Sequence, residues 1–483
     1  MKQNVYYKKI ARNSIFLLLS TLIGNLFLFL FNVVIAHLLG AEKLGIILLV
    51  SSVLLIFTLI ADIGIPFATT KMIAEYYVKN KLKQIKSTVV SSLKLIILFS
   101  IISTVILLFA SNYISNVILH ENITYFLQIF SITIILGMLI RYANSLFHGF
   151  QDMKYSFFTN VIQQFFSFLI TVILVITGYG VFGALLGRVI GFALAVIIGT
   201  IFSIFILKKY KITSKTSTWN GNRILSYGIL MYLPFLSIFI IPSLLNIIIG
   251  GYLYAKDVAL FGVSFSLVSL SFLILIPLSN VLLPTFSELN AKKDKLIKTL
   301  STLALKYIGI ISYTVAFIFV YFSAFILKII YGNEFIDASL IVVMLAFAVF
   351  LESFKVVTDP LLNGTNLAKY VTIAETIKFI IIFGLGILFV KYYGIIGGAY
   401  AVLIAFFVSI TLKLLFVNIK LKISLIDSKL INYLFLISLL AVFFILNIPV
   451  WWTLLASIII IILTKCVSIK EIKQILKIIF QNK

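Results

Sequence analysis

Charged residues are scarce in this chain. Of its 483 residues, 11% are charged, whereas 62% are hydrophobic and 15% are aromatic. A soluble domain needs roughly a quarter of its residues charged, because charged side chains cover its surface. A chain this long with so few charges therefore belongs in a membrane. This excludes secreted scaffolds, cytosolic enzymes and nucleic-acid-binding proteins, so we expect no nucleic acid among its partners.

Cysteine is nearly absent as well. The single residue, Cys466, permits neither an internal disulfide nor a cysteine-ligated metal site. The three histidines, His37, His120 and His148, lie far apart in the sequence and form no pattern typical of metal ligands. We therefore expect no metal and no other cofactor.

Long apolar runs are what the chain has in abundance. A membrane-spanning helix needs about 20 mostly apolar residues, and the sequence predicts fourteen such spans. Their approximate limits are 14–36, 44–66, 88–110, 123–147, 157–177, 181–207, 224–249, 258–284, 301–327, 338–360, 370–390, 395–417, 430–447 and 450–467.

Acidic residues are few beside basic ones, with 15 Asp and Glu against 39 Lys and Arg and a net charge of +24. Short cytoplasmic loops are enriched in Lys and Arg. If the N-terminus lies in the cytoplasm, few basic residues fall in the breaks between spans on the outer side of the membrane. These are Lys43, Lys256, Lys328 and Lys391. The pattern predicts cytoplasmic termini and a multi-pass protein of the cell (cytoplasmic) membrane. The lysine-rich inner loops also suit contact with anionic membrane lipids.

Two halves of the chain resemble each other at an offset of about 214 residues. GYGVFGALLG from Gly178 aligns with YYGIIGGAYA from Tyr392. Further aligned pairs are Leu146 with Leu361, Gly149 with Gly364, Lys154 with Lys369, and Tyr155 with Tyr370. The repeat holds six spans, so both copies share one orientation and are expected to be related by a pseudo-twofold axis along the membrane normal. Transporters use such parallel repeats, with the substrate site between them.

The predicted fold class is therefore an all-α polytopic membrane protein of about 14 transmembrane helices. We expect an N-terminal six-helix lobe at 1–210, a basic cytoplasmic linker at 211–223 and a C-terminal six-helix lobe at 224–420. Residues 421–483 would add accessory helices 13 and 14 and a basic cytoplasmic tail.

The segment from Ala11 to Tyr77 contains a Gly-x-x-x-x-Gly turn, Gly40 to Gly45, before a span that ends in an Asp-x-Gly pattern, Asp62 to Gly64. It resembles the start of the Wzx-like polysaccharide biosynthesis and lipid-linked oligosaccharide flippase family. That family belongs to the multidrug/oligosaccharidyl-lipid/polysaccharide (MOP) exporter superfamily. The similarity covers roughly residues 10–420. It implies a MATE-like fold that flips a lipid-linked, pyrophosphate-bearing oligosaccharide by alternating access of two lobes. We also expect a monomer.

Arg188 lies inside the sixth predicted span, about eight residues from its outer end. Ionisable side chains in a span are costly and by default face a cavity or pair with another charge. Arg188 has small helical neighbours, Ala184, Gly191 and Ala195. A guanidinium there could bind the pyrophosphate of a lipid-linked sugar, because its planar fork of donors fits phosphate oxygens. The alternative is an arginine that snorkels outward or pairs structurally.

Further charges lie in the tenth and eleventh predicted spans. Glu352, Lys355 and Asp359 recur at i, i+3 and i+7 and so share one helix face. Glu375 and Lys378 make a similar pair, whose repeat partners are Asn160 and Gln163. We interpret these equivalent polar faces as walls of a wetted central cavity. Intrahelical ion pairs near the inner interface are the alternative.

Asn25 and Asn32 recur with Thr21 at near-helical spacing on the first span, either facing a cavity or bonding neighbouring helices. We expect Asp62 to be structural, and Arg141 to snorkel towards the inner interface. The candidate substrate-binding residues are Arg188, Lys355, Lys378, Glu352, Glu375, Asn25, Asn32 and Gln163.

Three functions are open at this point. The first is the flippase. The second is an ion-coupled multidrug or cation antiporter of the same fold, in which Glu352 or Glu375 would exchange its ion for the substrate. The third is a membrane glycosyltransferase or polymerase, which the short outer breaks and scattered outer acids disfavour. We therefore expect no catalytic residues and no enzymatic activity.

Overall fold

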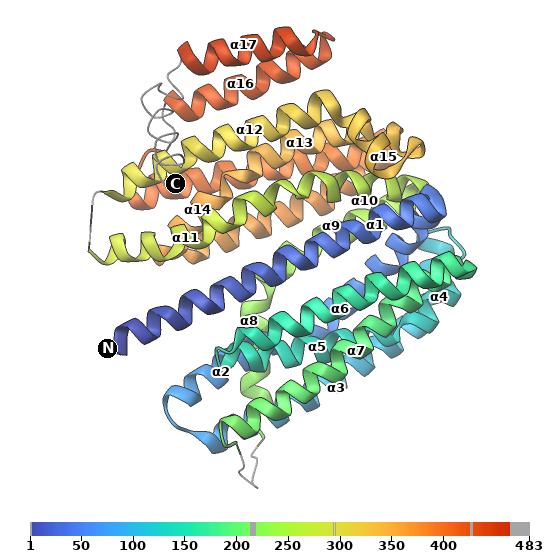
Figure 1. The fold of residues 1–483 in the computed structure, drawn as a ribbon, viewed down its shortest axis with the longest axis vertical. Helices are drawn as coiled ribbons and strands as arrows, with labels where there is room; N and C mark the ends of the chain where they lie inside the picture. The colour runs from blue at the N-terminus through green and yellow to red at the C-terminus, as the bar shows by residue number, and fades with distance from the viewer. Residues whose placement is uncertain (1, 213–218, 293, 295, 426–427, 464–483) are drawn as a thin grey trace, which may run out of the picture. The chain divides into compact units, whose positions relative to one another are not determined.

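The computed structural model describes residues 2–212, 219–292, 294, 296–425 and 428–463, and most of them lie in α-helices (Figure 1). Part of the predicted basic linker, Cys466 and the predicted basic tail lie outside these residues. The described chain divides into two compact units. One comprises Met1–Ser266, Leu327–Ala338 and Ile382–Gly398, and the other Leu267–Ile326, Ser339–Ile381 and Ala399–Lys483. The predicted lobe boundaries at 210 and 224 remain predictions.

The first unit is built mainly on the N-terminal helices. They are α1 (Lys2–Asp62), α2 (Ile65–Val78), α3 (Leu82–Tyr113), α4 (Thr124–Phe130), α5 (Ile132–Gly149), α6 (Met153–Leu174), α7 (Gly180–Lys209), α8 (Gly221–Phe239), α9 (Ile241–Tyr252) and α10 (Ala255–Ser269). Helices α6 and α7 lie side by side, and both pack against α1. Helix α5 packs against α2, α3 and α7.

The second unit is built mainly on α11 (Ser271–Ala291), α12 (Leu296–Tyr331), α13 (Ser339–Ser353), α14 (Lys355–Gly364), α15 (Ala368–Leu421), α16 (Ser428–Ile445) and α17 (Val450–Leu463). Its core is apolar and includes Phe286, Phe350, Phe354 and Tyr433. Helix α11 packs against both α13 and α14, and α16 packs against α17.

Eight helical runs in the described chain are long and apolar enough to cross a membrane. Three of them, residues 12–62, 153–209 and 368–421, each cover two predicted spans. In each a glycine with positive φ, Gly40, Gly178 or Gly394, interrupts the helix near the predicted break. The all-α class is confirmed. The number of spans and the orientation of the termini remain predictions.

The backbone repeats the internal similarity of the sequence. Gly180 (φ 52°, ψ −133°) and Gly394 (φ 61°, ψ −146°), which align at offset 214, adopt nearly the same conformation, one that residues other than glycine rarely adopt. Gln151 and Asn366, at offset 215, both have positive φ, 57° and 63°. This agreement supports the predicted duplication at the level of local structure.

Candidate functional site

Helix α7 packs closely on α6 along a row of small residues. A Cβ on Gly187 would lie 2.5 Å from the backbone nitrogen of Thr171, and one on Gly191 would lie 2.6 Å from that of Ser167. The Thr171 hydroxyl donates to the carbonyl of Ala184 across this contact, at 3.1 Å. The small neighbours predicted around Arg188 thus bring the two helices together.

Arg188 itself lines a cavity of about 300 Å³ inside the first unit. The walls come from the second half of α1 and from α4, α5, α6 and α7. The lining residues are Ser51, Leu54, Leu55, Thr58, Phe130, Thr133, Gly137, Ile140, Arg141, Asn144, Asn160, Gln163, Leu185, Arg188 and Phe192. Of the predicted site residues, the structure brings Arg188 and Gln163 together here.

The guanidinium of Arg188 has a polar partner but no acidic one in the described chain. Its Nη1 donates to Oγ of Ser51 at 2.5 Å, and its Cζ lies 5.6 Å from the centroid of the Phe31 ring. No carboxylate of the described residues pairs with it. Arg188 therefore places an uncompensated positive charge on the wall of an intramembrane cavity, where an anion would be stabilised.

Arg141, the second arginine of the cavity, is differently placed. Its Nε donates to Oδ2 of the buried Asp62 at 2.6 Å, and Oδ1 of Asp62 accepts from the backbone N–H of Gly64 at 3.0 Å. Arg141 therefore does not simply snorkel to an interface as predicted. Asp62 neutralises its charge and stabilises the αL turn at Gly64, which agrees with the structural role expected for Asp62.

The hydroxyl groups of the cavity donate to backbone carbonyls three or four residues earlier in the chain. Ser51 donates to the carbonyl of Ile47 at 2.6 Å, Thr58 to that of Leu54 at 2.7 Å, and Thr133 to that of Phe130 at 2.7 Å. Their remaining lone pairs can only accept hydrogen bonds.

Two amides continue this wall. Nδ2 of Asn144 donates to Oδ1 of Asn160 at 3.0 Å, and Nδ2 of Asn160 donates to Oγ of Ser20 at 3.2 Å. Oδ1 of Asn144 is buried and has no hydrogen-bond partner among the residues that the structure describes. A buried acceptor left unpaired is costly, so a donor that reached this oxygen would bind favourably.

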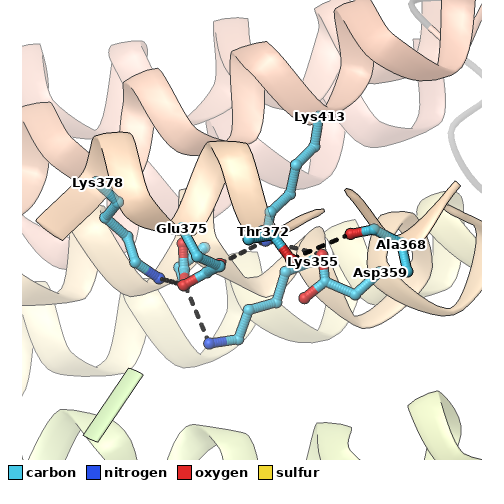
Figure 2. Close-up of polar contacts among 8 residues, drawn as sticks. Lys355, Asp359, Ala368, Thr372, Glu375, Lys378 and Lys413 are labelled. Carbon is cyan, nitrogen blue, oxygen red and sulfur yellow. Dashed lines mark hydrogen bonds and ion pairs between the residues drawn. The ribbon is translucent and has the colours of Figure 1, made fainter. Parts of the chain in front are cut away.

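The second unit holds a buried ion network on α13, α14 and α15. Nζ of Lys378 lies 2.9 Å from Oε1 of Glu352 and also contacts Glu375, while Nζ of Lys355 lies 3.0 Å from Glu352. Nζ of Lys413 lies 2.7 Å from both Asp359 and Glu375. In Figure 2 the lysine side chains converge on these carboxylates.

The network balances its own charge, with three lysines against three acids. The side chains of Glu352, Glu375, Lys378 and Lys413 are at most 5% exposed, and Lys355 is the most exposed member at 32%. Glu375 and Lys378 pair within α15, as the sequence predicts, whereas the Glu352–Lys355 pair spans the break between α13 and α14. Lys378 and Lys413 also join different helices. The four predicted site residues of this unit, Glu352, Lys355, Glu375 and Lys378, thus form ion pairs with one another.

The cavity and the network occupy the same place in the two repeats. At offset 215, Glu352, Lys355, Asp359, Glu375 and Lys378 correspond to Gly137, Ile140, Asn144, Asn160 and Gln163, all of which line the cavity. Glycine and uncharged side chains in one copy leave a cavity where charged side chains in the other form an ion network.

Asn25 and Asn32 are not among the residues lining this cavity. Asn25 is exposed, and Asn32 is buried with its Oδ1 unpartnered in the described chain. The repeat partner of Asn32, Asn246, donates to Oγ of Ser52 at 3.0 Å. A substrate-binding role for either asparagine remains a prediction.

Sequence reasoning overlooked Lys413, Asn144 and the hydroxyls of Ser51, Thr58 and Thr133. From the sequence, Lys413 resembles the basic residues near the cytoplasmic ends of predicted spans that set the orientation of the chain in the membrane. Asn144 had a usable signal, because it aligns with Asp359 at offset 215. The hydroxyl groups carried none, since serine and threonine are common throughout the spans.

Comparisons with known proteins agree with this architecture. The family model described as "Polysaccharide biosynthesis protein" matches residues 10–290. An uncharacterized membrane protein of Methanocaldococcus jannaschii is 27% identical over 423 residues, which cover 82% of this chain and 94% of that protein.

Two solved structures share the fold. The lipid II flippase MurJ in an inward closed conformation has a TM-score of 0.68 at 17% identity, over 92% of this chain and 96% of that one. An inward-facing multidrug resistance MATE family transporter of the MOP superfamily has a TM-score of 0.67 at 17% identity, over 83% and 94%. The MATE-like fold that the sequence predicts is thereby confirmed.

Proposed function

The chain belongs to the polysaccharide biosynthesis protein family, and from that premise we propose that it flips a lipid-linked oligosaccharide across the cell membrane. The polar headgroup would pass through the protein by alternating access between two lobes, while the lipid tail stays in the bilayer. A pyrophosphate link, a monomeric state and contact of the inner loops with anionic lipids belong to the same proposal.

The observation that carries this proposal is the positive charge of Arg188 on the wall of the cavity. An uncompensated cation inside a membrane domain is costly, so it suits an anionic ligand that compensates it during transport. Arginine offers several donors in a fork that matches phosphate oxygens, and Ser51 engages one of its nitrogens, Nη1. The uncharged amides around it leave this positive charge undiminished.

The antiporter alternative draws less support. It needs a carboxylate that can hold and release an ion in exchange for a drug. Oε1 of Glu352 lies within 3.0 Å of two lysine nitrogens, and Oε1 of Glu375 lies 2.7 Å from Nζ of Lys413. Ammonium groups of the protein thus occupy the positions that a coupling cation would take. The substrate-binding roles predicted for these acids and lysines remain proposals.

The test is genetic and chemical, in the organism that carries the gene. Deletion should cause a lipid-linked oligosaccharide to accumulate on the cytoplasmic side while surface glycan falls. The wild-type gene should restore export, whereas Arg188→Ala should fail to do so at an equal protein level. Arg12→Ala, which removes an exposed arginine, is the matched control and should restore export.

The opposite outcome is equally clear. If lipid-linked sugars and surface glycan are unchanged by the deletion while sensitivity to cationic drugs rises, the flippase proposal is wrong. Loss of drug resistance in Glu352→Gln, with resistance kept in Arg188→Ala, would then establish the antiporter.

A further inference from the structure

We propose that the cavity of the first unit binds the sugar attached to the phosphate, and that Asn144 and Thr133 read its hydroxyl groups. The cavity would thus recognise a phosphorylated sugar rather than an anion alone. This inference rests on the proposed function and adds to it a specificity site and the residues that form it.

The hydrogen-bonding capacity of the wall supports this assignment. The hydroxyls of Ser51, Thr58 and Thr133 have committed their hydrogens to backbone carbonyls, so towards a ligand they act as acceptors. Oδ1 of Asn144 is also an acceptor and is unpartnered in the described part of the chain. These four acceptors favour a ligand with several donors, and a sugar presents a donor on every free hydroxyl.

Arg188 contributes hydrogen-bond donors and a positive charge to the same cavity. Its guanidinium has donors only, so it favours a ligand that has acceptors and negative charge at that end. A phosphate linked to a sugar has both parts: an anion for Arg188 and a row of hydroxyl donors for the acceptor wall. A hydrophobic cation would leave Arg188 uncompensated, and an inorganic anion would leave Asn144 Oδ1 unpaired.

The size of the cavity limits what it can hold. At about 300 Å³ it lies at the lower end of the roughly 300–1,000 Å³ range of small-molecule sites. Apolar and aromatic side chains, including Phe130 and Phe192, complete its lining. We therefore assign it to one sugar and its phosphate, not to a whole oligosaccharide.

The residues at equivalent positions of the two repeats also favour an anionic sugar as the ligand of this cavity. Asn144 and Asn160 occupy the positions of Asp359 and Glu375 in the other copy. Carboxylates at these positions would repel a phosphate, whereas amides can bond a sugar without adding negative charge. The neutral copy is therefore compatible with an anionic sugar, and the charged copy is filled by its own ion pairs.

The experiment measures binding to the purified full-length protein by isothermal titration calorimetry. The probes are the 1-phosphates of glucose, galactose and mannose, with methyl phosphate as the matching anion that lacks hydroxyl groups. At least one hexose 1-phosphate should bind about tenfold more tightly than methyl phosphate, the gain expected from one or two additional hydrogen bonds. In Arg188→Ala, both kinds of probe should lose affinity.

Two variants test the recognition of the sugar. Thr133→Val keeps the shape of the side chain but removes an acceptor, and Asn144→Leu removes the unpaired oxygen. Both should reduce the preference for the hexose 1-phosphate severalfold and leave the affinity for methyl phosphate unchanged. Thr314→Val is the matched control, because Thr314 is exposed and its hydroxyl likewise donates to a backbone carbonyl, that of Ile310 at 2.9 Å.

The outcomes separate the two proposals. If methyl phosphate binds through Arg188 but no sugar phosphate binds more tightly, this inference is overturned and the anion site stands. The inference is also overturned if Thr133→Val and Asn144→Leu leave the preference unchanged. If neither probe binds the wild-type protein, the anion site of the proposed function fails, and this inference fails with it.

Discussion

Lys413 is expected to hold the ion network of the second unit together. Its Nζ lies 2.7 Å from Asp359 and 2.7 Å from Glu375, and its side chain is fully buried. The change Lys413→Met keeps most of the apolar stem but leaves three acids against two lysines. Removing one partner of a buried ion pair typically costs about 3–5 kcal/mol, because the remaining charge is buried without compensation. We expect a loss of this size in the free energy of unfolding.

A second substitution should recover most of that loss. In the double variant Lys413→Met/Asp359→Asn, the network retains Glu352, Lys355, Glu375 and Lys378, which are connected to one another and balanced in charge. The double variant should therefore be more stable than Lys413→Met alone. Such a reversal is typical of a charge imbalance and not of lost packing, which a second substitution would not repair.

The assay is equilibrium unfolding of the purified protein in mixed micelles of sodium dodecyl sulfate and a mild detergent. Lys292→Met is the matched control, because Lys292 pairs with Glu288 at 2.5 Å on an exposed helix face. An exposed pair contributes about 0–1 kcal/mol. If Lys413→Met is no less stable than this control, or if the double variant is no more stable than the single one, the reasoning is wrong.

Three further predictions concern glycines and one surface charge. Gly180 and Gly394 have positive φ, and no atom lies within 4 Å of a Cβ added to either. Gly180→Ala and Gly394→Ala should therefore each lower the free energy of unfolding by about 1–3 kcal/mol through backbone strain alone. Gly384→Ala is the control, because Gly384 lies on a regular helix with open space around its Cβ position, and it should lose no stability. Gly191→Val should lose more than these, because its Cβ would clash with the backbone of Ser167 in the α6–α7 contact, and a thermal unfolding curve would show it. Lys79 lies 2.7 Å from Glu75 and lowers the pKa of that carboxyl group, so this pair adds stability at neutral pH that disappears as the pH falls through the lowered pKa. The change Lys79→Met should therefore raise the pKa of Glu75, which an NMR titration measures. An unchanged pKa of Glu75 would contradict this cause.

The sequence predicted the features that arise from local chemistry. Apolar runs gave the helices, and glycines at the predicted breaks, such as Gly40 and Gly394, proved to interrupt them with positive φ. Arg188 was found because a lone charge in an apolar span is conspicuous, and the structure places it on a cavity wall.

Features that depend on packing between distant helices were harder to predict. Lys413 looked like a cytoplasmic loop charge, because nothing near it in sequence shows that Asp359 and Glu375 lie within 2.7 Å. Arg141 was misjudged for the same reason, since its partner Asp62 lies 79 residues away. The acceptor character of Thr133 follows from the direction of its hydroxyl hydrogen bond, which the sequence does not contain.

The duplication explains why the two charged sites differ. The predicted duplication gives the two halves equivalent positions, and different residues occupy those positions. In one copy these positions now hold three acids that lysines neutralise, so that the charges are satisfied without a ligand. In the other, the equivalent positions hold Gly137, Asn144, Asn160 and Gln163. Of the two arginines on that cavity, Arg141 pairs with Asp62, whereas the described chain offers no carboxylate to Arg188. The ion network balances its own charges, whereas on the proposed function an anionic substrate would balance the charge of Arg188 in the cavity. A substrate that must be captured and then released is better served by a site whose charge the protein itself leaves unpaired, and this is why we propose that substrate recognition takes place in the first unit.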